Sequence, residues 1–256
     1  MVRKIISFSA IMLFSVSVCT MTFAEEPSSE TKNWEWNLAP FYLWAVSVDG
    51  DQTVGSNTGD IKVDFSDIID KLEGAFIVNF QGVYQNRWGF IFDYTYLHLS
   101  DDDTNSVGIN KDVDLKLNLA ELDGFYRWNY LKHNFDGRIG LRLISMDATV
   151  KLEPVSREAG EVKQWVDPIV GLRWGWHFAD QWGLKLSGDM GGFGLGSDFT
   201  WQAVGIIHWQ PFKHASFFGG YRALYIDYDD GSKGSEDYYK LDATMHGPIV
   251  GVNFRW

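Results

Sequence analysis

Histidine and aspartate side chains near the ends of two apolar segments are the best candidates for chemistry. His98 is close in sequence to Asp101, and His246 is close to Asp242. An imidazole beside a carboxylate can activate water as a general base, which is hydrolase chemistry. Since the chain has no Gly-x-Ser-x-Gly, His-Glu-x-x-His or cysteine-based motif, we expect no enzyme. A hydrolase at the rim of the fold is the less favoured alternative.

Two acidic runs could bind divalent cations, because carboxylate oxygens are the ligands that calcium prefers. Neither run is followed by the twelve-residue loop with a closing glutamate that typifies a calcium-binding hand. We therefore expect weak cation effects only, with no resident metal and no cofactor. The candidate cation-binding residues are Asp101, Asp102, Asp103, Asp227, Asp229 and Asp230.

The composition excludes several classes of protein. The 256 residues carry a formal net charge of −12, whereas a protein that binds nucleic acid needs a basic face. A single cysteine excludes a disulfide scaffold, and abundant aromatic residues exclude a disordered chain. The aromatic share of 16% is high and needs a structural explanation.

The N-terminus has the order of segments found in a cleaved secretion signal. Arg3 and Lys4 precede the short apolar run Ile5–Val18, and Thr22–Ala24 offers small residues for cleavage. We predict a signal peptide over residues 1–24 and one exported domain over residues 25–256. Export without disulfides is compatible with the periplasm or the outer membrane of a Gram-negative cell.

Alternating side chains through the exported part predict a transmembrane β-barrel. No other segment approaches the length of apolar sequence that a membrane-spanning helix needs. In Trp88–His98 and Val166–Trp176, aromatic and aliphatic residues occupy one face of each strand, and charged or small residues fall on the other. A barrel with a lipid-facing exterior explains both this alternation and the many aromatic residues.

Ten strands are predicted, and eight would result if the hairpin over residues 182–210 were merged. Short and long connections alternate, which returns both ends of the chain to the same side of the barrel. The predicted strands cover residues 34–47, 74–85, 88–99, 112–128, 136–151, 164–177, 182–194, 198–210, 215–227 and 238–256.

Four positions do not fit regular strands. Leu119-Ala120 interrupts the alternation, so Glu121 and Asp123 would reach the lumen only past a bulge. Proline cannot donate a hydrogen bond to a sheet, and bulges or irregular pairing are therefore also expected at Pro40, Pro168 and Pro248.

Five segments resemble a family of uncharacterised proteobacterial outer-membrane proteins. They are Trp36–Ala45, Val63–Ile69, Gly188–Gly194, Ser197–Gln202 and Gly220–Arg222. The resemblance covers nearly the whole exported domain and implies a barrel in the outer membrane, but no established activity or site residues.

The last strand suggests which partners the barrel meets. Pro248–Trp256 alternates and ends on an aromatic residue, similar to the terminal strand that the barrel assembly machinery recognises. The other expected partners are outer-membrane lipid and lipopolysaccharide, and we expect a monomer that binds no nucleic acid.

Charged residues on the inward faces predict a network that fills the lumen, because charges buried away from water must be paired. A structural or surface-interaction role follows from this interpretation. The alternative is a narrow, porin-like pore for small solutes or ions, since rings of charge also line channels. The predicted lumen residues are Asp93, Glu121, Asp123, Arg127, Arg138, Arg142, Asp167, Arg173, Lys185, Asp189 and Arg222.

The first long connection, residues 48–73, is predicted to contain a short helix. Phe65, Ile68, Ile69 and Leu72 share one helical face, and Asp64 or Ser66 could cap the helix. We expect the helix to pack over the mouth of the barrel, and a lid or plug that gates passage is the alternative.

Overall fold

The structure is a computed structural model that describes residues 33–104, 110–153, 157–235 and 237–256. For residues 101–104, 110–113, 148–153 and 157–161 it describes the backbone alone. The predicted signal peptide, residues 1–24, lies outside the described residues. Within the described part of the chain, no helix has the length and apolar character needed to cross a membrane.

The described chain is almost entirely β-structure, with one short helix, α1 (Phe65–Asp70). The strands are β1 (Trp34–Ala39), β2 (Tyr42–Trp44), β3 (Ser47–Val54), β4 (Asn57–Val63), β5 (Leu72–Tyr84), β6 (Trp88–Thr104), β7 (Asn110–Tyr130), β8 (His133–Glu153), β9 (Arg157–Trp176), β10 (Trp182–Gly192), β11 (Phe199–Trp209), β12 (Ala215–Asp230) and β13 (Tyr239–Arg255).

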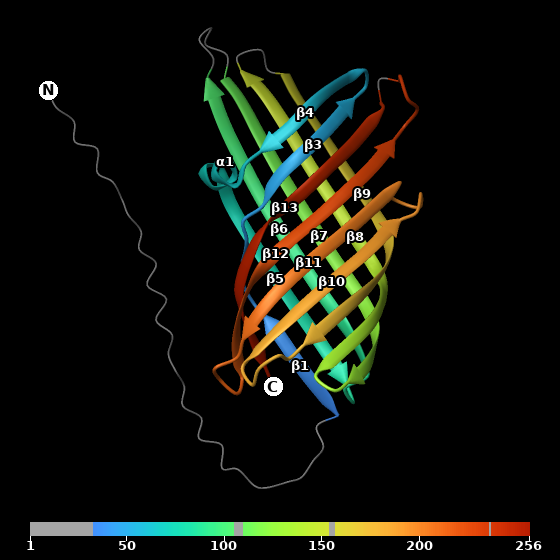
Figure 1. The fold of residues 1–256 in the computed structure, drawn as a ribbon. Coiled ribbons are helices and arrows are strands. Elements are labelled where there is room, and N and C mark those ends of the chain that lie inside the picture. The colour runs from blue at the N-terminus through green and yellow to red at the C-terminus, as the bar shows by residue number, and fades with distance from the viewer. Residues whose placement is uncertain (1–32, 105–109, 154–156, 236) are drawn as a thin grey trace, which may run out of the picture. The chain divides into compact units, whose positions relative to one another are not determined.

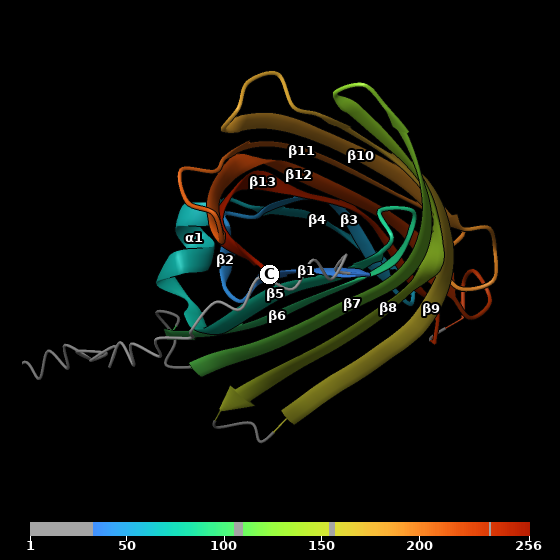
Figure 2. The same cartoon turned by 90° about the horizontal axis from the view of Figure 1, so that it is seen from below.

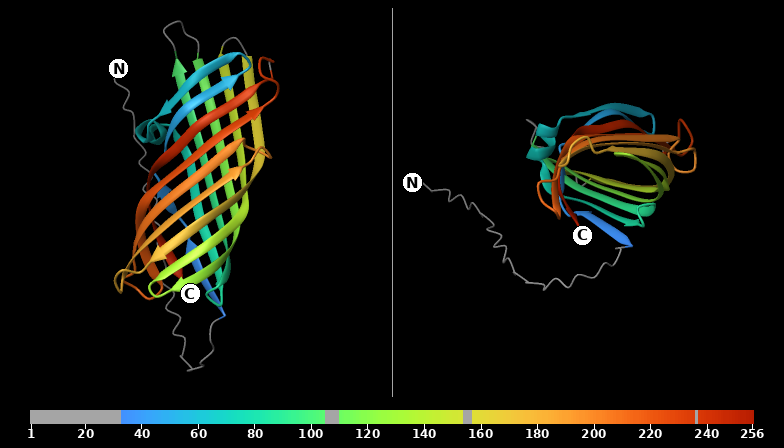
Figure 3. Two further views of the ribbon diagram at one scale, coloured as in Figure 1. Left: turned by 45° about the vertical axis from the view of Figure 1, so that its right-hand side comes forward. Right: turned by 60° about the horizontal axis from the view of Figure 1, so that its bottom comes forward.

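These strands form a closed antiparallel barrel of ten strands, as predicted. Each strand from β5 to β13 pairs with the next in sequence, and β1 closes the ring by pairing with both β5 and β13 (Figures 1 and 3). The segments β1, β2 and β3 follow one another along β13 and act as one interrupted first strand. We call the end of the barrel where β1 begins the turn end, and the opposite end the loop end.

The three prolines lie where the sheet pairing is interrupted. Pro40 falls between β1 and β2, where the register against β13 shifts by one residue. Pro248 lies opposite the gap between β2 and β3, and its carbonyl accepts a hydrogen bond from the Ala45 N–H (2.9 Å). Pro168 lies just beyond the end of the β9–β10 ladder. Pro168 and Pro248 stay in register with Leu141 of β8 and Tyr221 of β12, and the interruption lies on their other side.

Several predicted loops are extensions of the strands. β6, β7, β8 and β9 continue through parts of the connections expected at 100–111 and 152–163, and β7 and β8 are joined by a tight two-residue turn. The connection 48–73 contains the hairpin of β3 and β4 before α1. Long antiparallel strands were underestimated because their loop-end halves contain many charged residues.

No bulge is needed at Leu119-Ala120, so that expectation is wrong. β7 keeps one register against β6 and β8 throughout its length. Leu119, Glu121 and Asp123 all point inward and are buried. The alternation only seemed broken because the interior changes from apolar to charged along the strand.

Helix α1 lies at the side of the barrel wall rather than over its mouth, which corrects the expected position. Figures 1 and 2 show it outside the ring of strands, between β4 and β5. Its first N–H, that of Phe65, donates to Ser47 Oγ (3.1 Å), and Asp64 makes no side-chain cap. Ile68 is the buried helix residue, Ile69 is exposed, and Leu72 belongs to β5.

Candidate functional site

The interior of the barrel contains two cavities separated by ion pairs. The cavity at the turn end has a volume of about 720 Å³ and a largely polar lining. The cavity toward the loop end has a volume of about 630 Å³ and is lined almost entirely by apolar side chains. Tyr42 borders both cavities, so the layer between them is one side chain thick at that position.

The layer of ion pairs is built from inward-facing residues of five strands, β6, β7, β8, β10 and β12, and we call it the partition. Arg142 donates to Glu121 (2.8 Å) and to Asp189 (2.7 Å). Arg222 donates to Asp93 (3.1 Å) and lies 3.5 Å from Glu121. The partition consists of Asp93, Glu121, Asp123, Arg138, Arg142, Asp189 and Arg222, with Tyr42 and Gln202 bonded to it.

The neutral members of the partition satisfy the remaining hydrogen bonds. Tyr42 donates to Asp93 (2.9 Å), and Gln202 accepts from Arg222 (2.8 Å) while its amide faces Glu121 (3.2 Å). Arg138 is paired with Asp123. Buried charges are tolerated when they are paired and hydrogen-bonded, and the charges of the partition meet both conditions.

A second group of buried charges lies nearer the turn end and centres on Asp136, which the sequence analysis missed. Asp136 accepts from Arg127 (2.7 Å) and from Arg173 (2.5 Å), and Arg173 also donates to Gln81 (2.7 Å). Asp136 lies an even number of residues from Arg138 and Arg142, so it is on the same face of β8. Extending the alternation by one more pair of residues would therefore have predicted that Asp136 points inward.

Two predicted lumen residues lie apart from these networks. Asp167 accepts from the Ser197 N–H (2.6 Å) and Oγ (2.8 Å), so it anchors the turn between β10 and β11. Lys185 lines the turn-end cavity, and among the described residues it has no ion-pair partner. The predicted lumen set therefore divides into the partition, the Asp136 group and these two residues.

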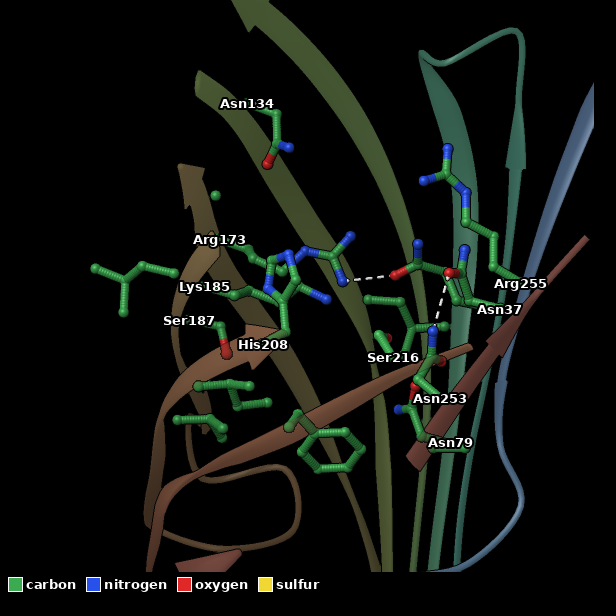
Figure 4. Close-up of a pocket in the computed structure, with 18 of the residues that line it drawn as sticks. Asn37, Asn79, Asn134, Arg173, Lys185, Ser187, His208, Ser216, Asn253 and Arg255 are labelled. Atoms are coloured by element: carbon green, nitrogen blue, oxygen red, sulfur yellow. Dashed lines mark hydrogen bonds between the residues drawn. The ribbon is translucent and has the colours of Figure 1, made fainter. Parts of the chain in front are cut away.

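The turn-end cavity is rich in nitrogen-bearing side chains. Figure 4 shows Arg173, Lys185 and His208 lying close together, with Asn134 above them and Asn37 and Asn253 across the cavity. Asn253 donates to Asn37 (3.3 Å). The partition closes this cavity on its inner side, since Glu121, Arg138 and Arg222 are among its lining residues.

The charge of Lys185 has a measurable consequence at His177, in the turn after β9. Partial burial lowers the pKa of the His177 imidazole below its ordinary value, and the Lys185 charge lowers it further. Lys185→Met is therefore expected to raise the His177 pKa, measured by an NMR titration of the imidazole. The matched control is Lys213→Met at the same end of the barrel, and an equal rise in both variants would contradict the assignment.

The loop-end cavity, which we call the apolar chamber, was not predicted. Its walls belong to a core cluster that includes Trp44, Val46, Leu117 and Met245. Arg222 lies 4.7 Å from the centroid of the Trp44 ring, so Trp44 separates the partition from the chamber. The sequence predicted a polar lumen throughout, whereas the loop-end part of the interior is lined by apolar side chains.

The predicted cation-binding residues at the loop end are engaged with other side chains. Asp230 pairs with Lys163 (2.9 Å), Asp227 pairs with Lys240 (3.2 Å), and Asp229 accepts from the Tyr238 hydroxyl (3.5 Å). The side chains of Asp101, Asp102 and Asp103 lie outside the described part of the structure. Within that part, no three His, Cys, Asp or Glu residues gather into a metal-binding group.

The two candidate histidines have aspartate partners other than those expected. His98 Nε2 lies 2.7 Å from Asp114, and His246 Nε2 lies 2.9 Å from Asp49. Asp242 instead accepts from the Tyr225 hydroxyl (3.0 Å). Both histidines alternate with inward-facing neighbours, which places them on the outer surface of the wall.

The chain matches no protein-family model and no curated protein. Among solved structures, the outer membrane protease OmpT from Escherichia coli matches with a TM-score of 0.56 at 7% identity, over 91% of this chain and 99% of OmpT. Ail from Yersinia pestis has a TM-score of 0.39 at 13% identity, over 88% of this chain and 99% of Ail. OprG from Pseudomonas aeruginosa has a TM-score of 0.37 at 7% identity, over 87% of this chain and 95% of OprG. The likeness to OmpT shows that the chain has the closed antiparallel fold of an outer-membrane β-barrel protein.

Proposed function

We propose that the chain is an integral outer-membrane β-barrel protein whose lumen is sealed by ion pairs, and that its role is structural or surface-interacting. The partition carries this proposal. It crosses the barrel between two cavities, and its arginines and carboxylates are almost completely buried. A water-filled path for solutes would have to displace several of these ion pairs at once.

The outer surface supports a location in a membrane. Large apolar side chains such as Ile139, Leu172 and Val250 are exposed on the outside of the wall. At the turn end, Trp88 packs edge-on against Tyr126 (4.6 Å between ring centroids), and Trp182 stacks on Trp209 (5.9 Å). Such aromatic residues mark the interface between lipid tails and water in transmembrane barrels.

Single-channel recording in planar bilayers tests the seal. The wild-type protein is expected to give no stable conductance steps, and regular steps would support the alternative of a narrow pore. Glu121→Ala combined with Arg142→Ala removes one cation and one anion from the partition, so this double variant should conduct. Protease protection in vesicles shows that each sample has inserted, which makes a silent wild-type recording interpretable.

The partners proposed for this barrel follow from its surface and its last strand. We propose contacts with outer-membrane lipid and lipopolysaccharide, recognition of β13 by the barrel assembly machinery, and a monomeric state. β13 pairs with β12 and with all three segments of the first strand. Adding β13 to the sheet during assembly would therefore close the ring.

We also propose that the protein is not an enzyme. The Asp49–His246 and His98–Asp114 pairs lie on the outer face of the wall rather than in a cleft that holds substrate. A screen of purified protein against peptides and lipid A tests this proposal. Turnover that is lost in His246→Ala or His98→Ala would overturn it.

A further inference from the structure

The apolar chamber opens through the barrel wall, as its lining residues indicate. Trp44, Val46 and Ile77 line it from the inside of the barrel. Phe41 (70% exposed) and Val250 (57% exposed) also line it, although both point outward. Side chains on opposite faces of a sheet can border one cavity only where the sheet is interrupted.

The interruption lies between the first strand and β5. Backbone pairing of β1 with β5 ends at Ala39 and Asn79, and β2 and β3 then continue along β13 without β5. Among the described strands, β4 pairs with β3 alone. Helix α1 borders the gap in the ladder, and its Ile68 inserts into the core cluster and lines the chamber. We call this gap the side window.

We propose that the apolar chamber binds an uncharged, hydrocarbon-rich small molecule that enters from the membrane through the side window. The volume of about 630 Å³ lies within the range of about 300–1,000 Å³ typical of small-molecule pockets. The chamber is continuous with the apolar outer surface through Phe41, Leu43 and Phe76. A molecule dissolved in lipid can therefore enter without crossing water.

The surrounding charges favour a neutral ligand over an anionic one. Below the chamber, the partition contains four carboxylates and only three guanidinium groups. At the loop end, Lys163, the cation among the lining residues, is paired with Asp230, whereas Asp227 and Asp229 alternate onto the outer face of β12. A carboxylate or phosphate group in the chamber would meet the excess of carboxylates in the partition and a desolvation cost, whereas an alcohol would not.

Photo-crosslinking in lipid nanodiscs tests the site. The probe is a long-chain alcohol with a diazirine in its chain, and a carboxylic acid of the same chain length and label is the comparison. After irradiation, mass spectrometry should place alcohol labels on inward-facing chamber residues such as Leu117 and Met245. An excess of unlabelled dodecanol should suppress these labels, and the acid should label them about tenfold less, a factor that corresponds to about 1.4 kcal/mol.

Two matched variants control for general lipid contact. Ala243→Phe places a ring in the chamber, and Ala203→Phe makes the same change on the exposed outer face of β11. Chamber labelling should fall about tenfold in Ala243→Phe and stay unchanged in Ala203→Phe. If Ala243→Phe does not fold, dodecanol competition on the wild type still decides the question.

The inference rests on the proposed membrane location. The same labelling data distinguish a failure of the chamber site from a failure of the membrane location. One outcome is that outward-facing residues such as Leu172 are labelled, but no chamber residue carries a label that dodecanol displaces. This outcome would support the membrane location and overturn the chamber site. An absence of labels on outward-facing residues would instead overturn the location. Equal chamber labelling by the acid would overturn the preference for a neutral ligand.

Discussion

Arg142→Ala is expected to lower the free energy of unfolding by about 3–5 kcal/mol, because it leaves the buried Asp189 carboxylate without its counter-ion and removes one of the two cations of Glu121. Arg142 is fully buried and is the partner that Glu121 and Asp189 share. Without it, Asp189 keeps a hydrogen bond from Gln202 but has no cation. Equilibrium unfolding in urea, followed by tryptophan fluorescence in lipid vesicles, measures the loss.

Arg255→Ala is the matched control for this prediction. Arg255 also donates to a carboxylate, that of Glu35 (2.7 Å), but both side chains of this pair are substantially exposed. Exposed ion pairs contribute about 0–1 kcal/mol. In addition, Arg142→Ala/Asp189→Ala should lose less than the sum of its single variants, since it removes both charges. A loss for Arg142→Ala no larger than for Arg255→Ala would contradict the structural role of the partition.

Asp136→Ala is expected to cost a comparable amount, about 3–5 kcal/mol, by leaving the buried Arg173 guanidinium and the partly buried Arg127 guanidinium unneutralised. Asp136 is fully buried and holds Arg127 and Arg173 on its two oxygens. Among the described residues, Gln81 would remain the hydrogen-bond partner of Arg173. The same urea unfolding experiment measures the effect.

The control for Asp136 comes from the exposed pair at the same end of the barrel. Glu35→Ala removes a carboxylate from Arg255, whose guanidinium stays in contact with water. This variant should lose about 0–1 kcal/mol. If Asp136→Ala/Arg173→Met regains part of the stability, the cost arises from the unneutralised charge; no recovery would indicate a packing defect instead.

Which residues face outward and which face the interior was largely predictable from the sequence, because alternation with a period of two is a local property of each strand. Asp93, Arg173 and Asp189 were assigned to the interior on this basis, and they are buried there. Which charges pair was not predictable. The Arg222–Asp93 contact joins strands on opposite sides of the barrel, and it depends on how the strands are staggered when the ring closes.

The apolar chamber was missed for a different reason. Assigning the inward face assumed that polar residues point inward, and toward the loop end that contrast is reversed. Leu117 and Leu119 on β7, and Leu241 and Met245 on β13, point inward and alternate with outward-facing residues that are mostly polar. Their position in the lumen follows from the continuous register of the sheet rather than from their residue types.

The sequence by itself determined a closed ten-stranded barrel with an apolar exterior, buried charges and a short helix in the first long connection. It could do so because strand alternation and turn residues act over a few neighbouring positions. The tertiary structure alone decided the pairing within the partition, the side window and the position of α1. Those features depend on where the first strand leaves β5, and that point is set by the closure of the whole ring.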